Sequence, residues 1–488
     1  MSHSSSDIDL RAVAEQVMRG RGFDPRFPTE VQKQVSTIQQ HPPLVTPGGN
    51  IRDLRNLLWS SIDNDDSRDL DQIEVAEQLP DGTVRILVGI ADVDAFVPKN
   101  SPIDVYAGRE TTTVYTGVRV FPMLPEPLST GITSLLEGED RLSVVTEYKV
   151  NAAGQIEGSD VYRAVVRNKA QLAYSAVGGW LEGATAADKI ASSTDLQAQV
   201  RLQDQVAQKL REQRFAHGAL NIESTELRPI FSGDQVVGIA DREKNRASNL
   251  IEELMIAANA SVARMLESKK MASIRRVVKT PERWDRIVEL ASEHGGHLPA
   301  QPDAKALNDF LIQRKAADPD HFADVSLTVV KLMGPGEYVV EHPGETPIGH
   351  FGLAVQDYTH STAPNRRFAD IVTQRLVKSL VAGATTPYSD SELSSIAQNC
   401  TEKQDAARRV ERDMSKRIAA VALKRRIGES FDAIVTGNKP HATFVRVLGP
   451  HVEGMLVSGQ KGLDVGDRVR VRLVNTDPQR GYIDFAKQ

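Results

Sequence analysis

The sequence predicts a multidomain α+β protein with a small N-terminal helical module, a large domain in which β-strands precede helices, and a C-terminal β-barrel of the oligonucleotide-binding (OB) type. Three observations predict this fold class. The chain has 488 residues, which is too long for one ordinary core. Strand-like alternation up to about residue 166 gives way to helical periodicity, and short strand-like segments return after residue 429.

The N-terminal module covers residues 1–50. Residues 7–19 and 29–40 fit two short helices, and Thr29 and Gln32 have the spacing of a capping box. A segment rich in Pro and Gly follows at 41–49. Two helices before a linker fit a helix-turn-helix-like module, and they fit equally well a helical arm packed on the next domain, so both interpretations stay open.

The large domain covers residues 51–428. It opens with strand-like segments, including a hairpin-type turn at 80–82 and an apolar, β-rich segment at 83–93. The order of strands followed by helices indicates a single α+β domain. Helical periodicity then covers residues 196–216, 245–268, 281–293, 303–314, 365–382 and 390–427.

The C-terminal domain covers residues 429–488. Five short strand-like segments with glycines between them are typical of an OB-type barrel, and a generic small β-barrel is the alternative. The segments are 431–436, 442–447, 452–457, 468–474 and 482–485.

The composition indicates a soluble globular protein. No apolar run approaches the roughly 20 residues that cross a bilayer, and residues 1–6 lack the basic and apolar regions of a secretory signal. Cys400 is the only cysteine, so the chain cannot form an intrachain disulfide and fits a reducing compartment. We therefore expect a cytoplasmic protein without membrane association, and no feature of the sequence indicates an obligate protein partner.

The charge is unevenly distributed along the chain. The net charge is −6, yet residues 402–428 contain nine Lys or Arg against four acidic residues. Five aspartates, in contrast, fall within the nine residues 63–71. This separation would allow a polyanion to be held at one place and processed at another.

The aspartate run can be explained in three ways. Carboxylates so close repel one another, so they must be spread into solvent or neutralised by a cation. The first possibility is a solvated acidic turn. The second is a calcium loop of the EF-hand type, but Arg68 stands where that loop needs glycine, and the flanking segments read as strands rather than helices. The third is a catalytic metal site.

A second polar cluster at 358–370 favours the catalytic site. There, Pro364 and Asn365 introduce Arg366 and Arg367 at the expected start of a helix. Aspartates can hold divalent metal, while a guanidinium and a helix N-terminus can accept phosphate charge. Together the two clusters predict phosphoryl-transfer chemistry.

These residues resemble the RNase II-type (RNB) exoribonucleases with a C-terminal S1 domain, over about residues 51–488. Residues 1–50 are too few for the cold-shock domains of typical bacterial members, so the chain resembles a short form. The matching motifs are the aspartate run, Asp-Leu-Arg at 53–55, Val-Tyr at 114–115, Phe-Pro-Met-Leu-Pro-Glu at 121–126, Leu-Ser at 128–129, Leu-Ile-Glu-Glu-Leu-Met-Ile-Ala-Ala-Asn at 250–259, His-Phe-Gly-Leu-Ala at 350–354 and the 358–370 segment.

The resemblance implies a metal-dependent active site. Asp63, Asp69 and Asp71 match ligands of Mg²⁺, and Asp71 is the carboxylate expected to be indispensable. Gln72 stands at a fourth ligand position where the family usually has aspartate, so we expect weaker Mg²⁺ binding and rescue by Mn²⁺. Arg366 matches the arginine that stabilises the scissile phosphate.

The resemblance also implies an RNA path. Tyr115 and Glu252 match residues at the 3′-terminal nucleotide, and Tyr174 matches another tyrosine of the path. Glu411 matches a conformational or RNA-contacting glutamate, and Arg367 is a further candidate for RNA contact. Each of these residues except Glu252 also fits a role without RNA. The two tyrosines could pack in the core, Glu411 could lie on a solvated helix face, and Arg367 could occupy a surface position.

The function that the resemblance implies is processive 3′-to-5′ hydrolysis of RNA that is single-stranded at its 3′ end, releasing nucleoside 5′-monophosphates. The alternative is a catalytically silent RNA-binding protein that keeps the RNA channel and the S1 barrel but has lost metal through Gln72.

Overall fold

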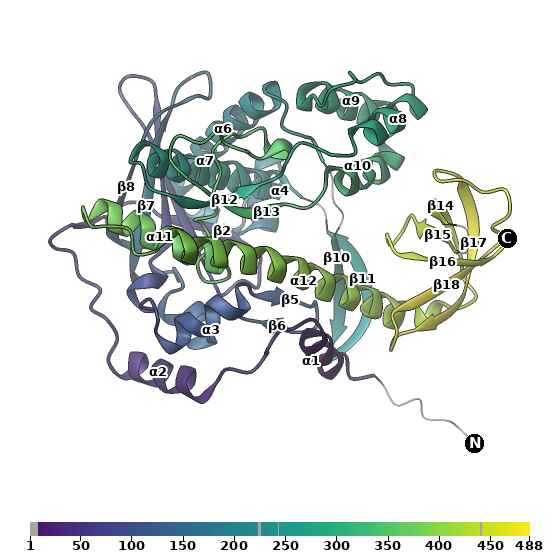
Figure 1. Cartoon of the computed structure of the whole chain (residues 1–488), viewed down its shortest axis with the longest axis horizontal. Helices are drawn as coiled ribbons and strands as arrows, with labels where there is room; N and C mark the ends of the chain where they lie inside the picture. Colours follow the sequence, from purple (N-terminus) through teal and green to yellow (C-terminus); the bar gives the residue numbers. More distant parts are fainter. Residues whose placement is uncertain (1–7, 223–225, 243, 440–441) are drawn as a thin grey trace.

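The computed structural model describes residues 8–222, 226–242, 244–439 and 442–488. It confirms the α+β class and the C-terminal barrel: a sheet with helices on both faces forms the main body, and the barrel lies at one end of the molecule (Figure 1). Within these residues no helix combines the length and the apolarity that crossing a bilayer requires. The expectation for residues 1–6 lies outside the described residues.

The helices are α1 (Leu10–Gly20), α2 (Thr29–Gln40), α3 (Pro102–Glu110), α4 (Tyr174–Leu181), α5 (Asp188–Ala191), α6 (Thr194–Ala216), α7 (Arg246–Ser268), α8 (Trp284–Glu293), α9 (Ala304–Ala317), α10 (Pro319–Met333), α11 (Phe368–Val381) and α12 (Asp390–Leu423). Short helical turns are η1 (Val93–Ala95), η2 (Leu128–Ile132), η3 (Phe351–Leu353) and η4 (Lys424–Arg426).

The strands before the barrel are β1 (Ile51–Asp53), β2 (Ser60–Asp63), β3 (Gln72–Gln78), β4 (Val84–Ala91), β5 (Val114–Tyr115), β6 (Val120–Phe121), β7 (Asp140–Val150), β8 (Ile156–Arg167), β9 (Ala170–Ala173), β10 (Glu226–Ser232), β11 (Gln235–Arg242), β12 (Ser273–Val277) and β13 (Glu337–Glu341). The barrel strands are β14 (Ser430–Lys439), β15 (Ala442–Val447), β16 (Glu453–Ser458), β17 (Arg468–Asp477) and β18 (Tyr482–Lys487).

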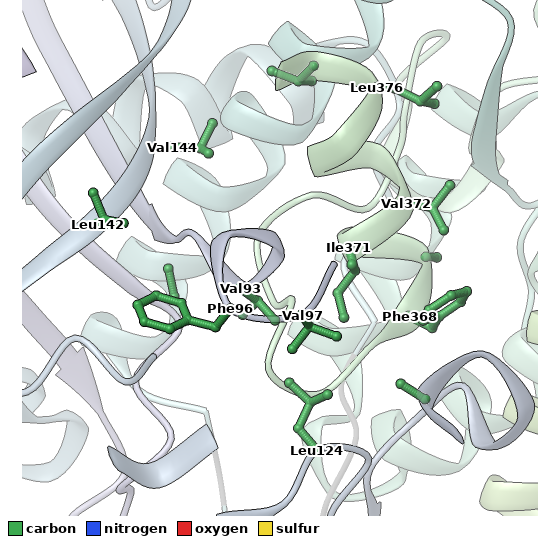
Figure 2. Close-up of a cluster of buried hydrophobic side chains, with 14 of the residues drawn as sticks. Val93, Phe96, Val97, Leu124, Leu142, Val144, Phe368, Ile371, Val372 and Leu376 are labelled. Atoms are coloured by element: carbon green, nitrogen blue, oxygen red, sulfur yellow. The ribbon is translucent and has the colours of Figure 1, made fainter. Parts of the chain in front are cut away.

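The central sheet has the strand order β1-β8-β7-β4-β3-β2-β9. Its strands alternate between two apolar cores, because successive side chains point to opposite faces. Ile73 and Val75 of β3 lie in the core that includes α11, whereas Ala76 lies in the core against α6 and α7. Figure 2 shows part of the first core, where Val93 and Val97 lie beside Ile371 of α11.

Helix α12 links the main body to the barrel. It begins with a capping box between Ser389 and Glu392 and runs across the molecule to the barrel (Figure 1). Near its end, Ala419, Ala420 and Leu423 enter the barrel core. The barrel is therefore packed on the helix that also passes the main body.

The N-terminal helices do not form a helix-turn-helix unit. Leu10, Ala14 and Met18 of α1 pack in a core shared with α12, whereas α2 packs against α3. This is the arrangement of a helical arm. The predicted capping box is wrong, because Pro28 is the N-cap of α2 and makes no side-chain capping bond.

Several elements were not predicted. Helices α3, α4 and α10 and the hairpin β10–β11 lie in segments where the sequence pattern gave no such element. The hairpin and the β12–β13 pair interrupt the expected run of helices. The strands-then-helices order is therefore approximate.

Candidate active site

The aspartate loop, residues 64–71, connects β2 with β3 and carries two of the predicted metal ligands. Asp63 is the last residue of β2, and Asp69 and Asp71 lie in the loop rather than on a strand. Asp63 Oδ1 accepts hydrogen bonds from the Asn64 amide (2.7 Å) and the Ser67 hydroxyl (3.0 Å). The start of the loop is thus held by its own local bonds.

The arginine turn, residues 363–367, leads into α11 and meets the aspartate loop. The Asn365 amide donates to Asp71 Oδ1 (2.9 Å) across 294 residues of sequence. Arg366 Nε lies 3.5 Å from Asp71 Oδ2, and the Arg366 side chain is 48% exposed while that of Asp71 is 3% exposed. The fold therefore joins the two predicted clusters, with a buried carboxylate and a guanidinium that solvent or a ligand can reach.

Burial controls the electrostatics of the aspartates. Burial raises the pKa of Asp71 to about 7, and Arg366 and the Asn365 amide oppose this rise. Burial also raises the pKa of Asp63. The charge on Asp69 adds to both shifts, so the Asp69 carboxylate lies close enough to repel both Asp63 and Asp71.

A divalent cation would relieve this repulsion, and carboxylate oxygens are the donors that hard cations prefer. By donor chemistry, Asp63, Asp69 and Asp71 fit such an ion. No three Asp, Glu, His or Cys side chains in the described part of the chain converge into a preformed metal cage. Ion binding would have to draw the carboxylates together.

Tyr115 and Glu411, both predicted RNA contacts, are brought together beside the aspartate loop. The Tyr115 hydroxyl donates to Asp69 Oδ2 (3.3 Å), and the Tyr115 amide donates to Glu411 Oε1 (3.1 Å). Tyr115 is 41% exposed, so core packing does not explain it. Glu411 does more than lie on a solvated helix face, because its carboxylate accepts a hydrogen bond from the strand that carries Tyr115.

Arg367 has a different environment from Arg366. Its Nε and Nη2 donate to the two oxygens of Asp370 (2.8 Å each), and Asp370 Oδ1 also accepts from the Ala363 amide (2.8 Å). The charge of Arg367 is thus paired with that of Asp370. The observed contacts give Arg367 a structural role, in which it stabilises the turn that presents Arg366. Direct contact with RNA stays a prediction for Arg367.

The other two predicted residues, Glu252 and Tyr174, have partners in other segments. Glu252 on α7 forms an ion pair with Lys244 (2.6 Å), and its side chain is 34% exposed. Tyr174 begins α4, and its carbonyl accepts from Asn245. The next residue, Ser175, donates to Asp65 (2.7 Å), so α4 is tied to the aspartate loop through the residue after Tyr174.

Gln72 is the first residue of β3 and is 8% exposed. Side chains alternate along a strand, so Gln72 shares the face of Glu74 and Ala76 rather than that of Ile73. No hydrogen bond joins its side chain to Asp63, Asp69 or Asp71 among the described residues. Its role as a ligand stays a prediction.

The sequence did not single out several residues that build the site. Asp370 could have been found, because it lies three residues after Arg367 at a helix start. Thr133 and Ser134 could not, since they act through contacts with distant segments, for which a single sequence carries no signal. Asn365 was visible only as part of the 358–370 cluster, without any sign of its backbone bond to Asp71.

Comparisons with known proteins agree with this geometry. The RNB domain model matches residues 51–383, and the model of the RNase II-type exonuclease C-terminal S1 domain matches residues 429–488. The chain is 31% identical to ribonuclease R of Thermotoga maritima, covering 94% of this chain and 68% of that protein. It is 30% identical to ribonuclease R of Escherichia coli, covering 94% of this chain and 60% of that protein.

Among solved structures, that of Mycoplasma genitalium RNase R in complex with ribose methylated single-stranded RNA matches with a TM-score of 0.87 and 22% identity, covering 98% of this chain and 78% of that one. This likeness shows the fold. The chain belongs to the RNB family of RNase II-type exoribonucleases, which act on RNA. The resemblance seen in the sequence is thereby confirmed, and the chain spans 60–68% of the length of the two relatives compared.

Proposed function

We propose that this chain hydrolyses RNA from a single-stranded 3′ end and releases nucleoside 5′-monophosphates, with Mg²⁺ or Mn²⁺ held by the aspartates. The observation that carries this proposal is the contact of Asp71 with the arginine turn, where Arg366 Nε lies 3.5 Å from Asp71 Oδ2. An anionic metal site beside an accessible guanidinium is the arrangement that a phosphodiester substrate requires.

Each residue of the site has a physical role in the proposal. Asp63, Asp69 and Asp71 would hold the metal, which when bound activates water and neutralises charge at the leaving oxygen. Arg366 donates hydrogen bonds to the scissile phosphate and stabilises the charge that develops on it. Asp370 pairs with Arg367 and keeps the turn rigid.

Recognition of the RNA 3′ end falls to residues around the aspartate loop. Tyr115, whose hydroxyl already reaches Asp69, would contact the terminal nucleotide next to the scissile bond. Glu252, a partly exposed acceptor on α7, would accept a ribose hydroxyl, which distinguishes RNA from DNA. Tyr174 and Glu411 would line the path that leads to them.

The basic face of α12 would guide the upstream RNA. Arg408, Arg412 and Lys416 are spaced four residues apart, so they share one face of the helix, and all three are exposed. The helix continues into the barrel, where the exposed Tyr482 and Met455 offer surfaces for bases. Phosphate contacts along this face would be independent of base sequence.

End-labelled RNA tests the proposal. Incubation with Mg²⁺ or Mn²⁺ should release labelled mononucleotide at once from 3′-labelled RNA, while 5′-labelled RNA should give label only in the shortest product. A DNA oligomer of the same sequence should survive. Binding of RNA without any cleavage in either metal would instead support the catalytically silent alternative, and equal degradation of DNA would refute the role of the ribose hydroxyl.

The metal requirement tests Gln72. Because an amide oxygen brings no charge to the site, Gln72→Asp should lower the half-saturating Mg²⁺ concentration, and Mn²⁺ should support wild-type activity better than Mg²⁺ does. Titrations of activity against each metal measure this effect, and identical curves for wild type and variant would rule out a ligand role for Gln72. A cytoplasmic location, where RNA and Mg²⁺ are present together, is part of the proposal.

A further inference from the structure

A short segment that no part of the proposed chemistry uses lies between the two halves of the site. Residues 133–135 follow η2, and Thr133 and Ser134 are buried, with 3% and 0% of their surfaces exposed. Their hydroxyl groups contact different segments of the site. One contacts the aspartate loop and the other contacts the arginine turn.

Ser134 holds the backbone on both sides of Asp69. Its hydroxyl donates to the Arg68 carbonyl (2.7 Å) and accepts from the Leu70 amide (2.9 Å). The Leu135 amide also donates to the Leu70 carbonyl (3.0 Å). The backbone conformation at Asp69, and with it the direction of the Asp69 side chain, is therefore held by residues 134–135 rather than by pairing within a β-sheet.

Thr133 holds the residue that precedes Arg366. Its Oγ1 lies 2.6 Å from Asn365 Oδ1 and 2.8 Å from the Leu128 carbonyl. A hydroxyl carries one hydrogen, so both contacts become full bonds when the Asn365 carboxamide presents Nδ2, which is otherwise buried without a partner. The Asn365 amide, in turn, donates to Asp71.

We propose that Thr133 and Ser134 are positioning residues that lock the aspartate loop to the arginine turn. Because the two residues are adjacent in sequence, they keep the positions of Asp69 and Asp71 relative to Arg366 constant. This inference rests on the proposed function. Neither side chain needs to touch RNA, because a displacement of about 1 Å in a site of this kind can reduce the rate about 100-fold.

Four variants test this role. Thr133→Val removes the hydroxyl at nearly constant shape, and Thr133→Ser retains it. Ser134→Ala removes the bridge across Asp69. The matched control is Ser143→Ala: Ser143 is also 0% exposed and its hydroxyl donates to the Ile90 carbonyl (2.9 Å), in contact with neither the loop nor the turn.

The measurements are kcat and KM for 3′-labelled RNA, Mn²⁺ affinity by calorimetry, and thermal unfolding. Thr133→Val and Ser134→Ala should each lower kcat at least about tenfold with KM within about twofold. Ser134→Ala should also weaken Mn²⁺ binding at least about threefold, since misplaced ligands bind metal less tightly. Thr133→Ser and Ser143→Ala should keep kcat within about twofold.

Three results would overturn the inference. The first is an unchanged kcat in both Thr133→Val and Ser134→Ala. The second is failure of Thr133→Ser to retain the activity that Thr133→Val loses. The third is an equal loss of kcat in Ser143→Ala, which would indicate general destabilisation. A wild-type chain that cleaves no RNA but binds Mn²⁺ would overturn the proposed function alone. The Mn²⁺ affinity of Ser134→Ala would then decide the positioning role.

Discussion

Asp71, at the end of the aspartate loop, and Glu74, inside strand β3, each carry a buried carboxyl group, but the two groups have different partners. Asp71 accepts from the Asn365 amide and lies beside Arg366, and burial raises its pKa to about 7. Glu74 is fully buried, neither of its oxygens has a hydrogen-bond partner among the described residues, and burial raises its pKa well above the ordinary range.

The difference shows what makes a buried acid usable in catalysis. Burial, together with the nearby charge of Asp63, raises the pKa of Glu74 and so favours its neutral, protonated form. A backbone donor and a guanidinium bring Asp71 back to a pKa where a cation can replace its proton. The predictions below test this contrast, beginning with the largest expected effect.

Asp71→Asn should abolish most of the activity. The amide keeps the shape and can still accept from Asn365, but it removes the charge that would hold the metal. Loss of outer-shell partners of metal ligands already costs about 10- to 100-fold, so loss of the ligand charge should cost more than about 100-fold in kcat. Mononucleotide release from 3′-labelled RNA at saturating Mn²⁺ measures it, and a loss of less than tenfold would exclude a ligand role.

Arg366→Ala should reduce kcat by roughly 100- to 1,000-fold, equivalent to about 3 to 4 kcal/mol of transition-state stabilisation. Arg366→Lys should recover part of this loss, because an ammonium supplies charge without the planar pair of donors. Arg286→Ala on α8, where Arg286 pairs with Glu289 on the surface, is the control and should behave as wild type. Equal activity of Arg366→Ala and the control would contradict the assigned role.

The metal requirement should depend on pH. Metal binds the carboxylate and not the acid, so a proton competes with the ion whenever the pH lies below the pKa of Asp71. With that pKa raised to about 7, the half-saturating Mg²⁺ concentration should fall as the pH rises from 6 to 7 and level off above about 8. Activity titrations at fixed ionic strength test this. A requirement that stays flat between pH 6 and 8 would show that Asp71 is already ionised without metal.

Glu74→Gln should have the smallest effect. The raised pKa of Glu74 favours the neutral carboxyl, and an amide of the same size resembles that form both in charge and in its packing between β3 and α6. We expect kcat within about twofold of wild type and little change in the unfolding temperature. A loss comparable to that of Asp71→Asn would place Glu74 in the working site and remove the contrast between the two acids.

The sequence predicted those elements whose signal is local. Strand β15 was predicted at its observed bounds, and α12 was predicted from its helical periodicity and confirmed to Leu423. The hairpin β10–β11 was not predicted because it lies between the helical segments 196–216 and 245–268, and its contacts with α12 form only after folding. Local patterns reveal elements, but not the partners that stabilise them.

The same distinction between local signals and long-range contacts applies to the site. The aspartate run and Arg366 were recognisable because charged residues cluster in sequence, and family resemblance supplied Tyr115 and Glu411, which the fold joins by a hydrogen bond. The contacts of Ser134 with the Arg68 carbonyl and of Asn365 with Asp71 depend on backbone atoms brought together from distant segments. Such contacts leave no pattern in a single sequence.

The central claim is that Asp71 and Arg366 act in one site although they are 295 positions apart in the sequence. A double-mutant cycle tests it most directly, with kcat measured for wild type, Asp71→Asn, Arg366→Ala and the double variant on 3′-labelled RNA at saturating Mn²⁺. One shared site predicts that the double variant is little slower than the slower single variant. A double variant whose loss equals the product of the two single losses would show that the residues act independently, and would contradict the claim.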